Sequence, residues 1–209
     1  MQRMNRKLTI VIAALMIALA AVTLVAAAIY YFYTAQVQVN VETPKVTWAS
    51  GTDMTATLGT NKTWCQITIN NLEPNATTCY TDALNFTVGG TNSSTNGMSL
   101  QIISVSDTNT IIWGIRFYVF TSGTSTTSLT LVDGGTVTVG STNGSSSLAA
   151  VGYRQANANS GYGSTSLPAL SSGFTGVNST TYIVAIEVMG KDGILTTQTA
   201  SLLMKLLFS

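Results

Sequence analysis

Hydrophobic and polar positions follow three patterns in succession along this chain. Residues 1–7 are mostly polar and basic, and residues 8–29 are apolar without one charged side chain, interrupted only by two threonines. Residues 36–42 then alternate strictly between polar and apolar side chains. Since the side chains of a strand point alternately to its two faces, this segment predicts a β-strand with one apolar face. That face consists of Ala35, Val37, Val39 and Val41.

From residue 46 onward, short apolar or β-branched runs are separated by turn residues, and no helical period is sustained. Asp133-Gly134, between two β-branched runs, is a hairpin signal. Many short strands at this spacing predict an all-β fold, an antiparallel β-sandwich of the jelly-roll type. The predicted strands are Val46–Trp48 with Asp53–Leu58, Trp64–Asn70, Cys79–Val88, Ser99–Ser106, Ile111–Phe120, Ser128–Val132, Thr136–Val139, Tyr182–Met189 and Ala200–Phe208.

Three segments need separate interpretation. Residues 145–181 are rich in Ser, Gly, Asn and Tyr, and their length predicts a long surface excursion or an insertion. The strand Ile111–Phe120 is apolar on both faces, which is typical of a strand covered on both sides. The last apolar run, Leu202–Phe208, fits a short amphipathic helix or a strand, and the surrounding β pattern favours the strand.

The N-terminal segment predicts export as an apolar leader helix. It is long for a secretory signal and just long enough to cross a bilayer. Ala26-Ala27-Ala28 offers a cleavage site after Ala28, while cleavage after Ala35 and an uncleaved anchor stay open as alternatives. The expected organisation is a leader or membrane segment at 1–28, a strand region at 29–45 and a sandwich domain at 46–209. Basic residues before the apolar run keep that end inside, so the rest is expected outside the cell.

Charge is scarce, with 9 Lys and Arg, 8 Asp and Glu, and no His. After the leader no basic residue has a basic neighbour in sequence, which argues against nucleic acid as a partner. Without His, the usual nucleophile pairs and the usual nitrogen ligand of metals are absent, and the carboxylates are scattered. We therefore expect no enzyme, no cofactor and no metal site. Calcium at the turns of Asp133 or Asp192 stays open.

Two cysteines, Cys65 and Cys79, stand on either side of a predicted turn at residues 71–75. An exported chain meets an oxidising compartment, so the sequence predicts a disulfide between them. Closing a loop of this length contributes about 3 kcal/mol in the chain-entropy model. Two separate buried thiols are the alternative.

Six Asn-x-Ser/Thr sequons occur in the chain, and a composition rich in Asn, Ser and Thr produces some of them by chance. Turns are the accessible places for a glycan, so we expect attachment at some of the turn sequons and not at Asn85, which falls in a predicted strand. The candidates are Asn61, Asn75, Asn92, Asn143 and Asn178.

The alternating strand at residues 35–42 follows the leader directly and has no turn residue before Pro44. One interpretation is an ordinary first strand of the chain's own sandwich. The other is a strand that completes the sheet of a neighbouring copy, because an unpaired edge with one apolar face readily pairs with another chain.

The stretch Val46-Thr-Trp-Ala-Ser-Gly-Thr-Asp-Met-Thr-Ala56, followed by Asn71-Leu-Glu-Pro-Asn75 and Asn85-Phe-Thr-Val-Gly-Gly90, resembles the start of the TasA/camelysin family of biofilm fibre proteins. The aromatic cluster Tyr30-Tyr31-Phe32-Tyr33 resembles that family's processing region. The resemblance covers roughly the first 90 residues. Low charge and sequon density are closer in character to archaeal bundling pilins. The resemblance implies a jelly-roll subunit that passes its N-terminal strand into the next subunit, whereas the cysteine pair departs from the bacterial members.

The leading hypothesis is a secreted structural subunit of an extracellular filament, a homopolymer joined by strand donation and used in adhesion, bundling or biofilm. The membrane would be met only through the leader. Two alternatives remain open: a type IV pilin-like subunit whose apolar helix forms the filament core, and a membrane-anchored surface domain that binds a ligand without polymerising.

Overall fold

The chain divides into two compact units, Met1–Glu42 and Thr43–Ser209. The computed structural model describes residues 46–69, 72–89, 95–107, 110–167, 169–170, 174–193 and 200–208, all of them in the second unit. The predicted leader, its cleavage site at Ala28 and the predicted donor strand lie outside these residues. The described part contains strands and one short 3₁₀ helix and no α-helix, which confirms the all-β prediction.

The elements in chain order are β1 (Val46–Ser50), β2 (Ala56–Leu58), β3 (Trp64–Ile69), β4 (Thr77–Val88), β5 (Thr95–Ser106), β6 (Ile112–Thr130), β7 (Thr136–Thr142), β8 (Ala149–Arg154), η1 (Ser160–Tyr162), β9 (Ala169–Leu170), β10 (Phe174–Val177), β11 (Thr181–Gly190) and β12 (Ala200–Phe208). The last strand confirms the β interpretation of the final apolar run.

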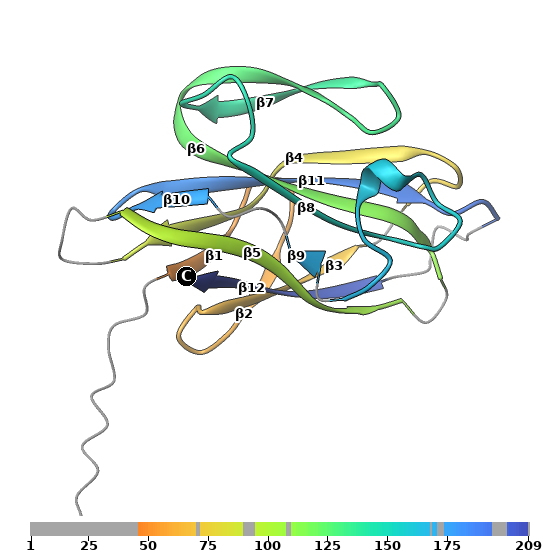
Figure 1. The fold of residues 1–209 in the computed structure, drawn as a ribbon, viewed down its shortest axis with the longest axis horizontal. Helices are drawn as coiled ribbons and strands as arrows, with labels where there is room; N and C mark the ends of the chain where they lie inside the picture. Colours follow the sequence, from red (N-terminus) through yellow and green to blue (C-terminus); the bar gives the residue numbers. More distant parts are fainter. Residues whose placement is uncertain are drawn as a thin grey trace, which may run out of the picture. The chain divides into compact units, whose positions relative to one another are not determined.

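The strands form two antiparallel sheets, which we name sheet A and sheet B (Figure 1). Sheet A has the order β1-β4-β11-β6-β7, and β8 also pairs with β6. Sheet B has the order β10-β5-β12-β3-β2, and β9 also pairs with β5. Strands distant in sequence are therefore neighbours in both sheets, so local runs alone could not have given this order.

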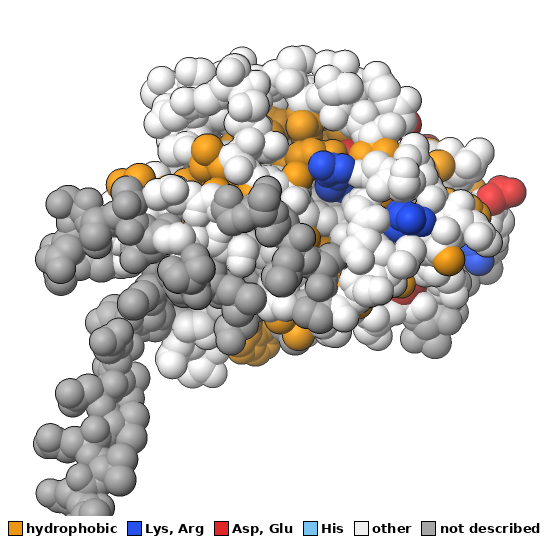
Figure 2. Space-filling view, in the orientation of Figure 1, with side chains coloured by type: hydrophobic (Ala, Val, Ile, Leu, Met, Phe, Trp, Pro, Cys, Tyr) orange, Lys and Arg blue, Asp and Glu red, His pale blue; other side chains and the backbone are white. Residues whose placement is uncertain are grey.

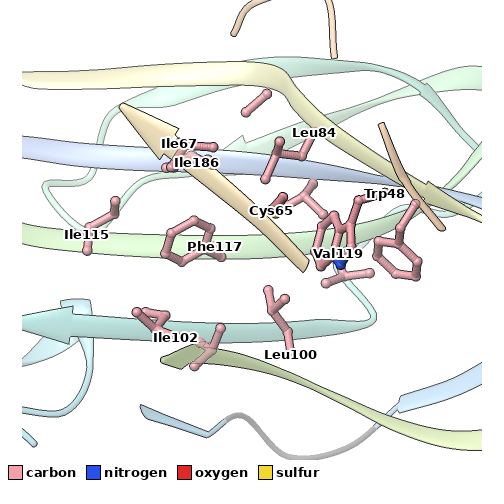
Figure 3. Close-up of a cluster of buried hydrophobic side chains, with 14 of the residues drawn as sticks. Trp48, Cys65, Ile67, Leu84, Leu100, Ile102, Ile115, Phe117, Val119 and Ile186 are labelled. Atoms are coloured by element: carbon pink, nitrogen blue, oxygen red, sulfur yellow. The ribbon is translucent and has the colours of Figure 1, made fainter. Parts of the chain in front are cut away.

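The main core lies between the two sheets, where alternate residues of facing strands are buried (Figure 3). Phe117 and Val119 of β6 meet Ile67 of β3 and Leu100 of β5, all of them 0% exposed. Trp48 of β1 packs at one side against Phe86, with ring centroids 5.3 Å apart. Each fully buried side chain of this size contributes roughly 1.5–3 kcal/mol, so this core is the principal stabilising feature of the sandwich.

The strand β6 is a single strand of 19 residues, whereas the sequence predicted two strands with a break between residues 120 and 128. That prediction was wrong because the intervening Thr- and Ser-rich stretch, in spite of its Ser122-Gly123 pair, continues in the β conformation. Irregular register with β7 at Ser122–Thr127 marks β-bulges, which bend a strand. The second half of β6 and β7 consequently form a two-stranded ribbon that arches over the outer face of sheet A (Figure 1).

A second, smaller core fills the space between this ribbon and sheet A. Its buried members come from the ribbon and from the outer face of β6 and β11: Tyr118, Phe120, Leu129, Leu131, Val139 and Ala185. The first half of β6 is thus covered on both faces, as its apolar pattern predicted. The hairpin signal Asp133-Gly134 is also confirmed. Leu131 N–H donates to Gly135 O, and Gly134 has a φ of +88°, which glycine adopts without strain.

The segment 145–181 was predicted to be a long surface excursion or an insertion, and this is wrong for the parts of it that join the two sheets. It contains β8, which pairs with β6, and β10, which pairs with β5. Ala149 and Val151 of β8 are buried in the main core. The sequence pattern does not predict β8 because the strand is rich in alanine and glycine, which carry little apolar area and no β preference.

Candidate assembly site and its surroundings

The edges of the two sheets are the places where a further strand can pair, because edge strands carry backbone groups without partners. Among the described strands, β2, β9 and β10 are too short to offer much, with 3, 2 and 4 residues. In β1, Trp48 N–H already donates to Lys62 O, so part of that edge is used. In β8, the outer edge bonds to the following loop through Ser164. The remaining long edge is β7, with 7 residues.

Within the described part of the chain, β6 is the only strand paired with β7. The ribbon that they form is almost free of charge, with Asp133 at its turn as the only ionisable side chain between residues 121 and 142. Its outer face carries exposed Ser128 and Thr138, which lie opposite each other. Charged side chains and prolines are the common means by which proteins block sheet edges, and β7 contains neither.

Beneath the ribbon lies a buried carboxylate, Glu187 of β11, with 0% exposure. One of its oxygens, Oε2, accepts a hydrogen bond of 2.6 Å from the Tyr118 hydroxyl, and the other, Oε1, accepts one of 2.9 Å from Val132 N–H. The Val132 amide lies at the end of the ribbon, so this bond ties the ribbon to sheet A. Sequence reasoning missed Glu187. The available signal was a single acidic residue inside the otherwise apolar run Tyr182–Met189.

Arg116 completes the polar surroundings of this carboxylate. It lies opposite Glu187 in the register of β6 and β11, and its guanidinium carbon stands 5.4 Å from the centre of the Tyr118 ring. Arg116 also donates a hydrogen bond to Gly161 O in η1. Burial and then the hydrogen bond to Glu187 raise the pKa of Tyr118, so its hydroxyl keeps its proton and remains a donor.

The loop that follows β8 is held by main-chain contacts. Arg154 donates through Nε to Gly163 O at 3.0 Å, and through Nη1 to carbonyls of the same loop. Tyr162 is 1% exposed and packs over Gly114, where a Cβ atom would overlap its ring. Burial is the main cause that raises the pKa of Tyr162. Both arginines therefore hold this loop against sheet A, and no pattern in the sequence indicates that role.

The predicted disulfide between Cys65 and Cys79 is absent, and both residues are free thiols. The physical reason is the direction of the two side chains. Cys65 on β3 of sheet B points into the main core between the sheets (Figure 3), whereas Cys79 on β4 of sheet A packs against the second core on the outer side. One sheet therefore separates them. Burial, and then the charges of Glu187 and Asp53, raise the pKa of Cys79 to about 11.

The Asp53 carboxylate is bound by groups in the middle of β4. Asp53 Oδ2 accepts hydrogen bonds from Thr81 Oγ1 at 3.0 Å and from Asp82 N–H at 2.8 Å. Burial opposes ionisation of Asp53, but the hydrogen bonds outweigh it and lower its pKa. Asp133 stabilises the turn between β6 and β7, because its carboxylate accepts a hydrogen bond from Gly135 N–H. Within the described residues no group of three or more metal-ligating side chains occurs.

The sequons differ in their surroundings. Asn61 and Asn75 are exposed at turns, and Asn143 is exposed while its Nδ2 donates to Ser122 O at 3.0 Å. Asn178 is half-buried after β10. Asn85 lies within β4, paired on both sides, and its Nδ2 donates to Asp82. Asn92 lies outside the described residues.

Figure 2 shows one face of the molecule, where charged side chains are few and hydrophobic side chains gather in a hollow beneath the ribbon. Within the described part no helix is long and apolar enough to span a membrane. No protein-family model matches the chain, and no curated protein matches it either.

Proposed function

We propose that this chain is a secreted structural subunit of an extracellular filament, in which each subunit donates its N-terminal strand to the next. The proposal is that of a homopolymer without enzymatic activity, used in adhesion, bundling or biofilm. The observation that carries it is the alternating segment Ala35–Val41, whose three valines and alanine form one apolar face that needs a partner to cover it. Among the described residues, the edge of β7 has no partner strand other than β6, so a strand of another copy can pair there.

We also propose that the sandwich follows a jelly-roll plan. Eight strands carry this proposal, counted first to eighth in chain order: β3, β4, β5, β6, β8, β10, β11 and β12. The strand order of sheet B is then β3-β12-β5-β10, which are the first, eighth, third and sixth strands of the eight. The order of sheet A is β4-β11-β6-β8, which are the second, seventh, fourth and fifth. Such interleaving of chain-distant strands in two antiparallel sheets is the connectivity of two joined Greek keys. In this plan β1, β2, β7 and β9 are additions to the eight.

The energetic argument for donation rests on the three valines of the segment. A fully buried valine contributes roughly 1.5 kcal/mol or more, and new backbone hydrogen bonds add about 0.5–1.5 kcal/mol each. Burial of three valines, together with the backbone hydrogen bonds of one paired strand, therefore favours a persistent joint between subunits over a transient one. A secreted subunit with few charges has little repulsion to oppose such contact.

The test is a Val39→Asp variant of the exported full-length chain, examined by electron microscopy for filaments and by circular dichroism for folding. The charge would be desolvated only at the joint, so we expect loss of filaments from a folded subunit. Val39→Thr is the matched control, because it is close in shape and carries no charge. Normal filaments from Val39→Asp would refute donation. Mass spectrometry of the mature N-terminus distinguishes the pilin-like alternative, in which the apolar helix is retained.

A further inference from the structure

We infer that the acceptor for the donated strand is the free edge of β7, so that a second copy's residues 35–41 extend the β6–β7 ribbon by one strand. This inference rests on the proposed function and names the partner surface that it leaves open. The occupant is therefore a segment of this same chain, contributed by another copy.

The first argument is the geometry of the free backbone groups. At the hairpin end, Gly134 N–H donates to Leu131 O at 3.0 Å and Leu131 N–H donates to Gly135 O at 2.7 Å. Bonded and non-bonded pairs alternate along an antiparallel ladder, so Val137 and Val139 make the next bonds to β6. The amide and carbonyl groups of Thr136 and Thr138 consequently point away from β6, toward the free edge.

The second argument is length and regularity. The regular part of β7 is residues 136–140, because Ser141 has a φ of +55°, and the alternating segment Ala35–Val41 is long enough to pair along all of it. The other edge of the ribbon belongs to β6, whose register is broken at Ser122–Ser125 and again at Ser125–Thr127. Bulges of this kind twist a strand and interrupt pairing, so the β6 edge is the poorer template.

The third argument is the chemistry of the two faces. Val139 is buried in the second core, and Val137 and Cys79 are partly buried at its margin. β7 also lies against β4, which carries Cys79. A strand added beside β7 with its apolar face toward sheet A would place its valines next to Val137. These valines would also cover the partly buried edge of the second core. Cross-strand pairs of β-branched residues are favourable, and half-exposed apolar surface would be covered.

The experiment compares two proline variants of the exported full-length chain, Thr138→Pro and Ser128→Pro. These two residues lie opposite each other and are both exposed, and neither uses its backbone N–H within the ribbon. Proline is tolerated on a strand edge whose N–H has no partner, so the ribbon should persist in both. We expect Thr138→Pro to lose filaments and Ser128→Pro to keep them.

A second measurement does not need a proline variant. Hydrogen exchange of the unmodified chain should show the Thr136 and Thr138 amides slowed at least tenfold in filaments relative to the unassembled Val39→Asp subunit. Equal exchange in the two states would overturn the inference.

The remaining outcomes separate the inference from the proposed function. If Val39→Asp abolishes filaments while Thr138→Pro keeps them, donation stands and the β7 acceptor is wrong. The β6 edge becomes the acceptor if only Ser128→Pro abolishes them. If Thr138→Pro abolishes filaments and Val39→Asp does not, β7 pairs with another segment, such as β7 of a second copy, and both proposals fail.

Discussion

The Tyr118 hydroxyl donates a hydrogen bond of 2.6 Å to Glu187, and both residues lie on the face of sheet A that the ribbon covers. The carboxylate is completely buried, yet it has partners on both oxygens. A buried charge without partners would be strongly unfavourable, whereas a satisfied one fixes the groups around it. Glu187 therefore determines where the ribbon is attached to the sandwich.

Removal of this carboxylate should destabilise the chain. Glu187→Ala leaves the Tyr118 hydroxyl and the Val132 amide buried without an acceptor, at about 1–3 kcal/mol each. Glu187→Gln keeps one acceptor oxygen, so we expect a smaller loss in the free energy of unfolding. Urea denaturation followed by fluorescence measures both. Equal stability of Glu187→Ala and the unmodified chain would show that the ribbon is held in another way.

Alkaline pH should weaken the fold through Cys79. Its pKa is about 11 in the folded chain against a usual value of 9.0, so the folded state binds the thiol proton more tightly. The contribution of this proton to the free energy of unfolding is complete below pH 9 and is lost as pH rises toward 11. Denaturation midpoints measured from pH 8 to pH 11 should fall less steeply in Cys79→Ser. Parallel curves for the two proteins would contradict this account.

Both cysteines should be recovered as thiols. Alkylation without a reductant followed by mass spectrometry should find both Cys65 and Cys79 modified, because a sheet lies between their side chains and keeps them as thiols. Alkylation of the folded chain should modify the half-buried Cys79 before the buried Cys65. A peptide pair joined by a disulfide would contradict the free-thiol structure.

The close contact between β8 and the following loop should tolerate no side chain at Gly152. A Cβ atom there would overlap the main-chain oxygen of Tyr162, and backbone cannot move aside as easily as a flexible side chain. We expect Gly152→Ala to reduce stability by about 1–3 kcal/mol, the usual cost of overpacking. Gly140→Ala is the matched control, since no atom lies within 4 Å of its added Cβ. Calorimetry should show a lowered Tm only for Gly152→Ala.

Exposed turn sequons should be the glycosylated ones if the chain is exported. Asn61 and Asn75 are exposed at turns, whereas the Asn85 side chain is half-buried within a strand paired on both sides. Glycopeptide mass spectrometry of native material should find glycans at Asn61 or Asn75 and none at Asn85. A glycan at Asn85 with none at Asn61 and Asn75 would contradict the prediction that exposure at turns decides which sequons are glycosylated.

Local chemistry was enough to predict much of the fold. Apolar or β-branched runs between turn residues predicted β4, β11 and the first half of β6, because such side chains suit strands with buried faces. Asp133-Gly134 predicted its hairpin because the turn needs a residue that adopts positive φ. The all-β class followed from these signals together.

What the tertiary structure alone decided is which faces meet. Cys65 and Cys79 are close in sequence, but the faces of their strands are opposite, and no local pattern records which sheet a strand will join. The same holds for Glu187, whose partners Tyr118 and Val132 come from distant positions on β6 and its turn. The sequence by itself determined most of the strands and their apolar sides, because the direction of each side chain in a strand and the conformation of each turn depend on neighbouring residues. Long-range packing determined pairing, the arch of the ribbon and the buried carboxylate, because burial is gained only when distant surfaces come together.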